Sequence, residues 1–321
     1  MTNNRYDYLE IEGWTAPVEQ VQEPLAAPSV TPVRVAAHRN TFRVVELIGR
    51  FGSKAGEFNT PGGLAADAAG TLYIADSYNN RVQIIAKNEA DIIGARGTAP
   101  GQLMLPMSVA LENTGCYYVV EQGNNRVQKF GPTGRTIYTI GTPGAGKMQF
   151  NSPRAVALDS KQNFYIADTG NNRVVTYNFK GQFRGQVNLA GPNDPFNRPC
   201  GLVVTADDEL IVADTWNHRL VRIDSVGKPL GSIGAYGDDM GQLSQPVGVA
   251  IDIDGGLVVS EAGNNRLQKY SISGIPVSTW DGHKSSIGPL ANPGGIAITR
   301  SGDIYLADTN NHRVIWFEMA L

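Results

Sequence analysis

The sequence predicts an all-β fold, a six-bladed β-propeller of four-stranded antiparallel blades, and the first observation behind this prediction is a repeat. A tract of an acid, two variable residues, Asn, Asn or His, and Arg occurs six times, as at 168–173. Its arginines, spaced 45, 47, 46, 47 and 47 residues apart, are Arg81, Arg126, Arg173, Arg219, Arg266 and Arg313. Self-similarity at such a period is typical of repeat architectures.

The second observation is that four short strands fit into each repeat. The first strand follows a proline, and these prolines are Pro61, Pro106, Pro153, Pro199, Pro246 and Pro293. A small residue two positions later permits the close backbone approach of strands crowded around an axis. A turn rich in Asp, Gly and Asn then leads to a second strand such as 72–75. Turn residues at this spacing predict antiparallel strands.

The repeated acidic tract forms the next turn, and the third strand begins at its arginine, as in 81–85. A fourth strand ends near an Ile-Gly pair such as Ile93-Gly94. Four strands in about 46 residues, without a helical period, are typical of a propeller blade. An apolar residue three positions before each proline is expected to fill a seam between blades, and these residues are Phe58, Leu103, Phe150, Phe196, Leu243 and Leu290.

The third observation concerns the ends of the repeated region. After Arg313 there is room for a third strand but not for a fourth, whereas 42–49 has the pattern of a fourth strand. Gly49 precedes Pro61 by the same interval that separates Gly94 from Pro106. We therefore expect the N-terminal strand to complete the last blade and close the ring, which leaves no long unpaired edge. The predicted domains are a tail and linker over 1–41 and a propeller over 42–321.

An acid stands five positions before each repeated arginine. These acids are Asp76, Glu121, Asp168, Asp214, Glu261 and Asp308, and their partners in order are Arg81, Arg126, Arg173, Arg219, Arg266 and Arg313. An acid and an arginine that flank a tight turn rich in Asn form an ion pair, while the Asn side chains bond the amides of the turn. Because catalysis would explain one such pair but not six, we predict that all six are structural.

The repeats resemble those of the NHL family, and Asn217-His-Arg-Leu220 is close to the tract that names it. The resemblance covers 42–321 and implies a six-bladed β-propeller. Functions in the family range from RNA and protein recognition to a few lyase-type enzymes. The fold alone does not choose among these functions.

Composition narrows the function classes. The net charge is −3, with 18 % charged residues, which argues against a surface for polyanions. The first twenty residues contain no apolar run, so we expect no secretory signal, and no later stretch has the length of a membrane span. We expect a soluble cytoplasmic protein. Cys116 and Cys200 fall at different points of their repeats, so they should be reduced thiols rather than a disulfide.

Two of the three function classes lack the residues that they require. The lyase-type relatives place metal-binding histidines directly after the repeat proline, but the four histidines here, His38, His218, His283 and His312, all lie elsewhere. We therefore expect no catalytic residues, metal or cofactor. The loops before the prolines mix acids and bases, whereas an RNA-binding face would be basic. The remaining class is a scaffold or accessory subunit that binds other proteins, with a metal-dependent lyase or hydrolase and an RNA-binding propeller as alternatives.

Candidate binding residues stand where the repeats differ, on the face that family geometry gives to the loops before the prolines and the acidic turns. Tyr78 and Trp216 replace small or polar residues at the turn tips. They either contact a partner or lie on a neighbouring blade. Arg154 is the only charged residue directly after a repeat proline. It either holds an acidic group or projects into solvent, and the mixed charge of the face favours solvent.

The N-terminal tail carries a separate candidate site. Tyr6, Tyr8, Ile11 and Trp14 place large apolar groups within a short acidic segment, ahead of a linker that contains Pro. A fully solvated segment is usually poor in aromatic residues, so this composition predicts a segment that orders on a surface. That surface is either the propeller itself or a groove of a partner. We favour a docking motif over 4–14, with Tyr8 and Trp14 as anchors.

Overall fold

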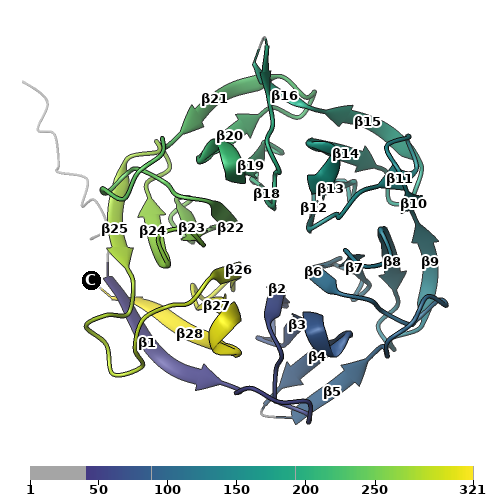
Figure 1. Ribbon diagram of the computed structural model, residues 1–321, viewed down its shortest axis with the longest axis horizontal. Coiled ribbons are helices and arrows are strands. Elements are labelled where there is room, and N and C mark those ends of the chain that lie inside the picture. The colour runs from purple at the N-terminus through teal and green to yellow at the C-terminus, as the bar shows by residue number, and fades with distance from the viewer. Residues whose placement is uncertain (1–40, 88, 192, 321) are drawn as a thin grey trace, which may run out of the picture. The chain divides into compact units, whose positions relative to one another are not determined.

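The computed structural model describes residues 41–320 except 88 and 192. Within these residues six four-stranded antiparallel sheets surround a central channel (Figure 1). The predicted all-β, six-bladed fold is therefore confirmed. The candidate docking motif at 4–14 lies outside the described residues and stays a sequence prediction.

The strands of each blade run in chain order from the channel outward, except in the last blade. The first three blades comprise β2 (Pro61–Ala66), β3 (Leu72–Asp76), β4 (Arg81–Ala86) and β5 (Glu89–Ile93), then β6 (Pro106–Leu111), β7 (Tyr117–Glu121), β8 (Arg126–Phe130) and β9 (Thr136–Ile140), then β12 (Ala155–Leu158), β13 (Phe164–Asp168), β14 (Arg173–Tyr177) and β15 (Phe183–Val187). The others comprise β18 (Gly201–Val204), β19 (Leu210–Asp214), β20 (Arg219–Ile223) and β21 (Pro229–Ile233), then β22 (Pro246–Ile251), β23 (Leu257–Glu261), β24 (Arg266–Tyr270) and β25 (Pro276–Trp280), then β26 (Pro293–Ile298), β27 (Ile304–Asp308), β28 (Arg313–Ala320) and β1 (Thr41–Ile48).

The loops contain short secondary-structure elements. Two small sheets pair β10 (Thr142–Pro143) with β11 (Gln149–Phe150) and β16 (Leu189–Gly191) with β17 (Asp194–Pro195). Single 3-10 turns follow the second strand of four blades, at η1 (Ser77–Asn79), η2 (Thr169–Asn171), η3 (Thr215–Asn217) and η4 (Thr309–Asn311). In the part of the chain that the structure describes, no helix is long and apolar enough to cross a bilayer.

The inner strands approach one another closely at the positions where the sequence has small residues. A Cβ atom added to Gly201 would lie 2.1 Å from the carbonyl oxygen of Val247 in the next inner strand, and one added to Gly295 would lie 2.6 Å from Cα of Gly63. A side chain at either glycine would therefore push two blades apart. The expected role of the small residues is confirmed.

The hydrophobic core lies in the seams between blades. Phe58, for example, is fully buried among Leu72 and Ile74 of its own blade and Val314 of the last blade. All six apolar residues that precede the prolines are buried in this way, namely Phe58, Leu103, Phe150, Phe196, Leu243 and Leu290. Burial of large side chains in every seam supplies most of the free energy that holds the ring together.

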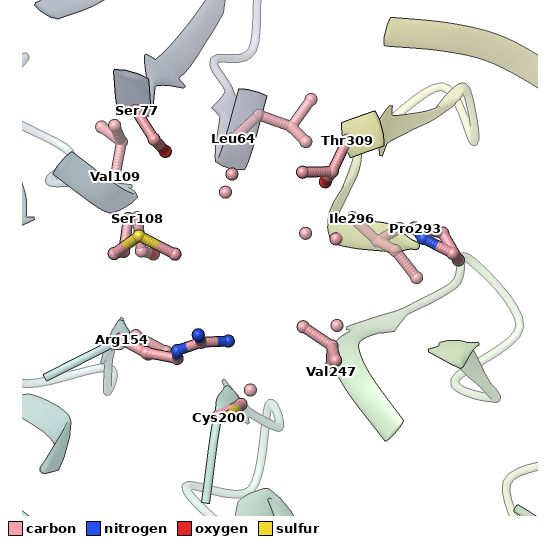
Figure 2. A pocket seen from close by; sticks show the side chains of 18 of the residues that line it. Leu64, Ser77, Ser108, Val109, Arg154, Cys200, Val247, Pro293, Ile296 and Thr309 are labelled. Atoms are coloured by element: carbon pink, nitrogen blue, oxygen red, sulfur yellow. The ribbon is translucent and has the colours of Figure 1, made fainter. Parts of the chain in front are cut away.

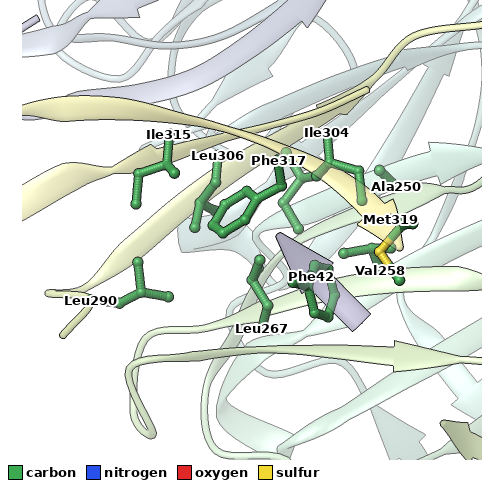
Figure 3. Close-up of a cluster of buried hydrophobic side chains, with 11 residues drawn as sticks. Phe42, Ala250, Val258, Leu267, Leu290, Ile304, Leu306, Ile315, Phe317 and Met319 are labelled. Carbon is green, nitrogen blue, oxygen red and sulfur yellow. The ribbon is translucent and has the colours of Figure 1, made fainter. Parts of the chain in front are cut away.

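The ring closes by pairing the first strand with the last. β1 runs antiparallel to β28, with Thr41 opposite Ala320 and Ile48 opposite Val314. Phe42 is buried, and its ring centroid lies 6.0 Å from that of Phe317 in an edge-to-face contact. Figure 3 shows both rings in the apolar cluster between the last two blades. β1 therefore contributes both hydrogen bonds and core packing to its blade.

Candidate functional site

The loops before the prolines and the acidic turns share one face of the propeller, as the sequence predicts. The backbone N–H of Tyr78 donates to the carbonyl oxygen of Asn59 at 3.1 Å, and that of Trp216 donates to Asn197 at 3.0 Å. Each bond joins a turn to the loop that enters the same blade. We call this surface the loop face, and its loops span 49–60, 94–105, 141–152, 188–198, 234–245 and 281–292.

Ion pairs between the repeated acids and arginines hold the loops of this face in place. Arg173 Nε donates to Asp168 at 2.8 Å, while its Nη atoms donate to the carbonyl oxygens of Ala145, Gly146 and Gln149 at 2.8, 2.8 and 2.9 Å. All six predicted pairs form, with fully buried acids and distances of 2.6 to 2.9 Å, at Asp76–Arg81, Glu121–Arg126, Asp168–Arg173, Asp214–Arg219, Glu261–Arg266 and Asp308–Arg313. Each pair holds the loop and the turn of its blade as one unit.

The last residue of each acidic turn connects neighbouring blades. It adopts a left-handed conformation, with φ between 49° and 55°, at Asn80, Asn125, Asn172, His218, Asn265 and His312. Asn enters this region with little strain. The side chain then accepts an N–H from the next blade: Leu105 N donates to Asn80 at 3.0 Å, and Gln245 N donates to His218 Nδ1 at 3.1 Å.

Both turn histidines therefore have a structural role. The Nδ1 of His312 accepts the N–H of Thr60 at 3.0 Å, so the ring carries its proton on Nε2, as does His218. His283 is exposed in a loop, and His38 lies outside the described residues. Among residues 41–320 without 88 and 192, no three His, Cys, Asp or Glu side chains are grouped as a metal site would require.

A pocket of about 330 Å³ occupies the mouth of the channel on the loop face. Its floor is a ring of aliphatic side chains, one from each inner strand: Leu64, Val109, Val156, Leu202, Val249 and Ile296. Above the floor stand the residues that follow the prolines: Gly62, Met107, Arg154, Cys200, Val247 and Gly294. The guanidinium of Arg154 points into this space (Figure 2). Arg154 is the only charged residue among the described residues that line it.

The solvated Arg154 that the sequence favours stays a prediction, and the structure shows how the residue is placed. Its side chain is half-buried, and its Nε is buried without a hydrogen-bond partner. The reason is the path of the inner strands, which converge and carry the residue after Pro153 inward over the pocket. The other two candidates differ in position, since Tyr78 lines the pocket and Trp216 does not.

Tyr78 and Trp216 are both exposed rather than covered by a neighbouring blade, at 64 % and 55 % of their surface. The Arg198 guanidinium lies 5.7 Å from the Trp216 ring, a cation–π contact. The structure adds Phe51 and Tyr236, 65 % and 72 % exposed, which sequence reasoning missed. The sequence does contain a signal for this pair, because both residues stand two positions after the glycine that follows a fourth strand.

Phe51 and Tyr236 each lie against a turn histidine, and these contacts define two aromatic patches on the loop face. The Tyr236 ring lies 4.6 Å from that of His218, which ends the turn that carries Trp216. The Phe51 ring lies 4.8 Å from that of His312. The loop that carries Phe51 also contains Asn59, which accepts the N–H of Tyr78. One patch therefore covers the junction of the fourth and fifth blades, and the other the junction of the sixth and first.

Ion pairs neutralise much of the charge around these patches. Arg219 Nη1 and Nη2 each donate to a carboxylate oxygen of Asp194 at 2.8 Å. This hydrogen bonding lowers the pKa of the Asp194 carboxyl. Arg50 donates to Glu57 at 3.0 Å, and hydrogen bonds from the Lys54 backbone and the Arg50 side chain likewise lower the pKa of Glu57. The loop face thus combines aromatic side chains with charges of both signs.

Comparisons with known proteins agree with this architecture. The NHL repeat matches residues 58–85, 196–223, 243–270 and 290–317, and a 6-bladed beta-propeller family matches residues 103–202. No curated protein matches the chain. Both cysteines are free, as predicted.

Several solved structures share the fold. A streptogramin B lyase covers 87 % of this chain and 98 % of its own, with a TM-score of 0.62 and 14 % identity. A virginiamycin B lyase from Staphylococcus aureus covers 87 % of this chain and 96 % of its own, with a TM-score of 0.59 and 18 % identity. A Bacteroides thetaiotaomicron protein of unknown function covers 87 % of this chain and 76 % of its own, with a TM-score of 0.67 and 19 % identity. At such identities the likeness shows the fold alone. The chain is a six-bladed β-propeller that contains NHL repeats.

Proposed function

We propose that this propeller is a non-catalytic module that binds another protein through its loop face, as a scaffold or accessory subunit. The observation that carries the proposal is the pair of exposed aromatic patches, one with Phe51 on His312 and the other with Tyr236 on His218, in the turn that carries Trp216. Large exposed aromatics gathered on one face are typical of interaction sites, because tyrosine and tryptophan combine apolar area with a polar group.

The rigidity of the loop face supports the same proposal. Arg173 alone ties its turn to three loop carbonyl groups. Arg81, Arg126 and Arg266 each do the same in their own blades. A surface that is ordered before binding loses little conformational entropy on association, so more of the contact energy contributes to affinity. Paired charges around the patches favour a protein over a polyanion, which would need a basic surface.

The tail belongs to this proposal as a second contact. Tyr6, Tyr8, Ile11 and Trp14 have the composition of a docking motif, and a second contact on the same chain would strengthen binding by raising the effective concentration of the partner.

The test removes one aromatic patch and compares the result with an equal change on the opposite face. The double variant Trp216→Ser, Tyr236→Ser should abolish capture of a partner from cells that make the protein. The reason is that an aromatic anchor commonly contributes on the order of 2 kcal/mol or more to the binding free energy. The control is Ile272→Ser with Ile275→Ser, two exposed residues in the turn between β24 and β25.

Capture is measured by affinity purification of the full chain with quantitative mass spectrometry, and folding by thermal melting. All four side chains are largely exposed, so both variants should melt within about 1 kcal/mol of the original protein. Retention of every partner by the loop-face variant, or loss of the same partner from the control, would contradict the proposal.

A further inference from the structure

We propose that the channel mouth is a binding site for a carboxylate on an apolar body, held by Arg154. This site goes beyond the loop-face interaction, since Trp216, Tyr236 and Phe51 do not line the pocket. Its position and its lining both point to a ligand smaller than a protein domain. The pocket volume of about 330 Å³ falls at the lower end of the range for small-molecule sites.

The first argument is the unpaired state of Arg154. Its Nε is buried with no hydrogen-bond partner, and no carboxylate of the described residues lies within ion-pair distance of its guanidinium. Every repeated arginine of the acidic tracts, by contrast, has a buried acid. A buried donor without an acceptor is costly. The guanidinium itself points into the pocket, where a carboxylate would bind its two Nη atoms with charge-assisted bonds.

A second polar group stands beside it. In four blades the residue after the repeated acid is Ser or Thr, whose hydroxyl donates to the proline carbonyl of the next blade, at Ser77, Thr169, Thr215 and Thr309. In the second blade this position is Gln122, which lines the pocket. Its side-chain amide makes no hydrogen bond with any other described residue. The seam that leads to Arg154 thus offers an amide donor and acceptor where four other seams have a hydroxyl bonded to the proline carbonyl.

The lining determines the rest of the ligand. One guanidinium compensates a single negative charge. The lining combines apolar side chains, such as Met107 and Val247, with polar ones, such as Ser108. A phosphate dianion would leave one of its charges without a partner, at a high desolvation cost. A monocarboxylate with an aliphatic or aromatic body meets both conditions. This carboxylate can belong to a free acid or to the C-terminus of a peptide that enters the channel.

The test uses the full chain and isothermal titration with hexanoate, its neutral analogue hexanamide, and inorganic phosphate. Hexanoate should bind saturably, with hexanamide and phosphate at least about tenfold weaker, because each lacks either the charge or the apolar body. Arg154→Met keeps the apolar stem of the side chain but removes the guanidinium, and it should weaken hexanoate binding by about tenfold or more. Arg184→Met, at an exposed position in β15, is the matched control and should change nothing.

A second variant covers the case in which Arg154→Met melts lower than the original protein. Arg154→Lys retains the charge but not the planar fork, so it should bind hexanoate with intermediate affinity and still prefer it over hexanamide. Two peptide probes, acetyl-Gly-Leu with a free or an amidated C-terminus, distinguish the sources. Tighter binding of the free peptide acid than of hexanoate assigns the site to a chain terminus, and the reverse order assigns it to a small acid.

Two results would overturn the proposal. One is equal binding of hexanoate by the original protein and by a folded Arg154→Met variant. The other is the absence of saturable binding by any of the carboxylates, free or peptide, at concentrations up to about 10 mM.

Discussion

Arg173 illustrates how one side chain holds a loop in place. Its guanidinium bonds one buried carboxylate and three carbonyl oxygens, so its removal would leave several acceptors unsatisfied. The carboxylate of Asp168 is fully buried. A buried carboxylate that loses its partner is among the most costly consequences of a single substitution.

We therefore expect Arg173→Ala to lower the free energy of unfolding by about 3 to 5 kcal/mol, the usual cost of breaking a buried ion pair. Thermal melting and denaturant titration measure the change. Arg184→Ala, which removes an exposed guanidinium, should cost less than about 0.5 kcal/mol. A melting curve of Arg173→Ala that matches the original would contradict a structural role for the pair.

The two turn histidines make a second prediction at this scale. His218 uses Nδ1 where Asn80 uses Oδ1 for the same contact with the next blade. His218→Asn should therefore keep both the left-handed conformation and the acceptor, and leave stability nearly unchanged. His218→Ala should cost about 1 to 3 kcal/mol, because it removes the acceptor of a backbone N–H and strains the turn.

Denaturant midpoints compare the two His218 variants directly. Equal loss in both would show that the imidazole ring itself matters, through its contact with Tyr236, rather than the shared acceptor.

At the scale of elements, β1 is the strand that closes the ring. It pairs with β28 along its length and buries Phe42 against Phe317. Without β1, the last blade would have three strands and β28 would expose an unpaired edge. The neighbouring apolar cluster would also lose a large side chain (Figure 3).

Removal of residues 1–38 should leave the melting temperature of the propeller unchanged, whereas removal of 1–50 should lower it strongly or cause aggregation. The second truncation deletes β1 and exposes the edge of β28. Differential scanning calorimetry and light scattering measure both effects. Equal stability of the two truncated chains would show that β1 is dispensable for closure.

Much of the architecture was predictable because it recurs six times. The spacing of the arginines gave the number of blades, and the position of Phe58 relative to Pro61 placed it in a seam. Arg154 occurs once, and the position of Phe51 is aromatic in only one other repeat, at Tyr236, so periodicity carried little information about their surroundings. The burial of Arg154 depends on how far the inner strands converge, and the exposure of Phe51 depends on the path of one loop. Unique residues need the three-dimensional structure.

At the scale of the whole molecule, the repeats provide a rigid ring and the departures from them provide candidate sites. The six ion pairs and the six seam residues preserve the ring. Arg154, Gln122 and the aromatic patches break the symmetry on the loop face. Because a repeated scaffold tolerates variation in its loops, new binding sites can arise without a change of fold.

Closure by β1 also sets the order of folding during synthesis. Blades one to five contain only strands that are consecutive in the chain, so each can form once its own segment has left the ribosome. β1 is made first, yet its partner β28 is made last. The last blade is thus assembled from opposite ends of the described chain, a contact of very high sequence separation that is slow to form. Until then Phe42 has no partner strand, and the nascent chain carries an apolar strand available to chaperones or to the β28 of another copy.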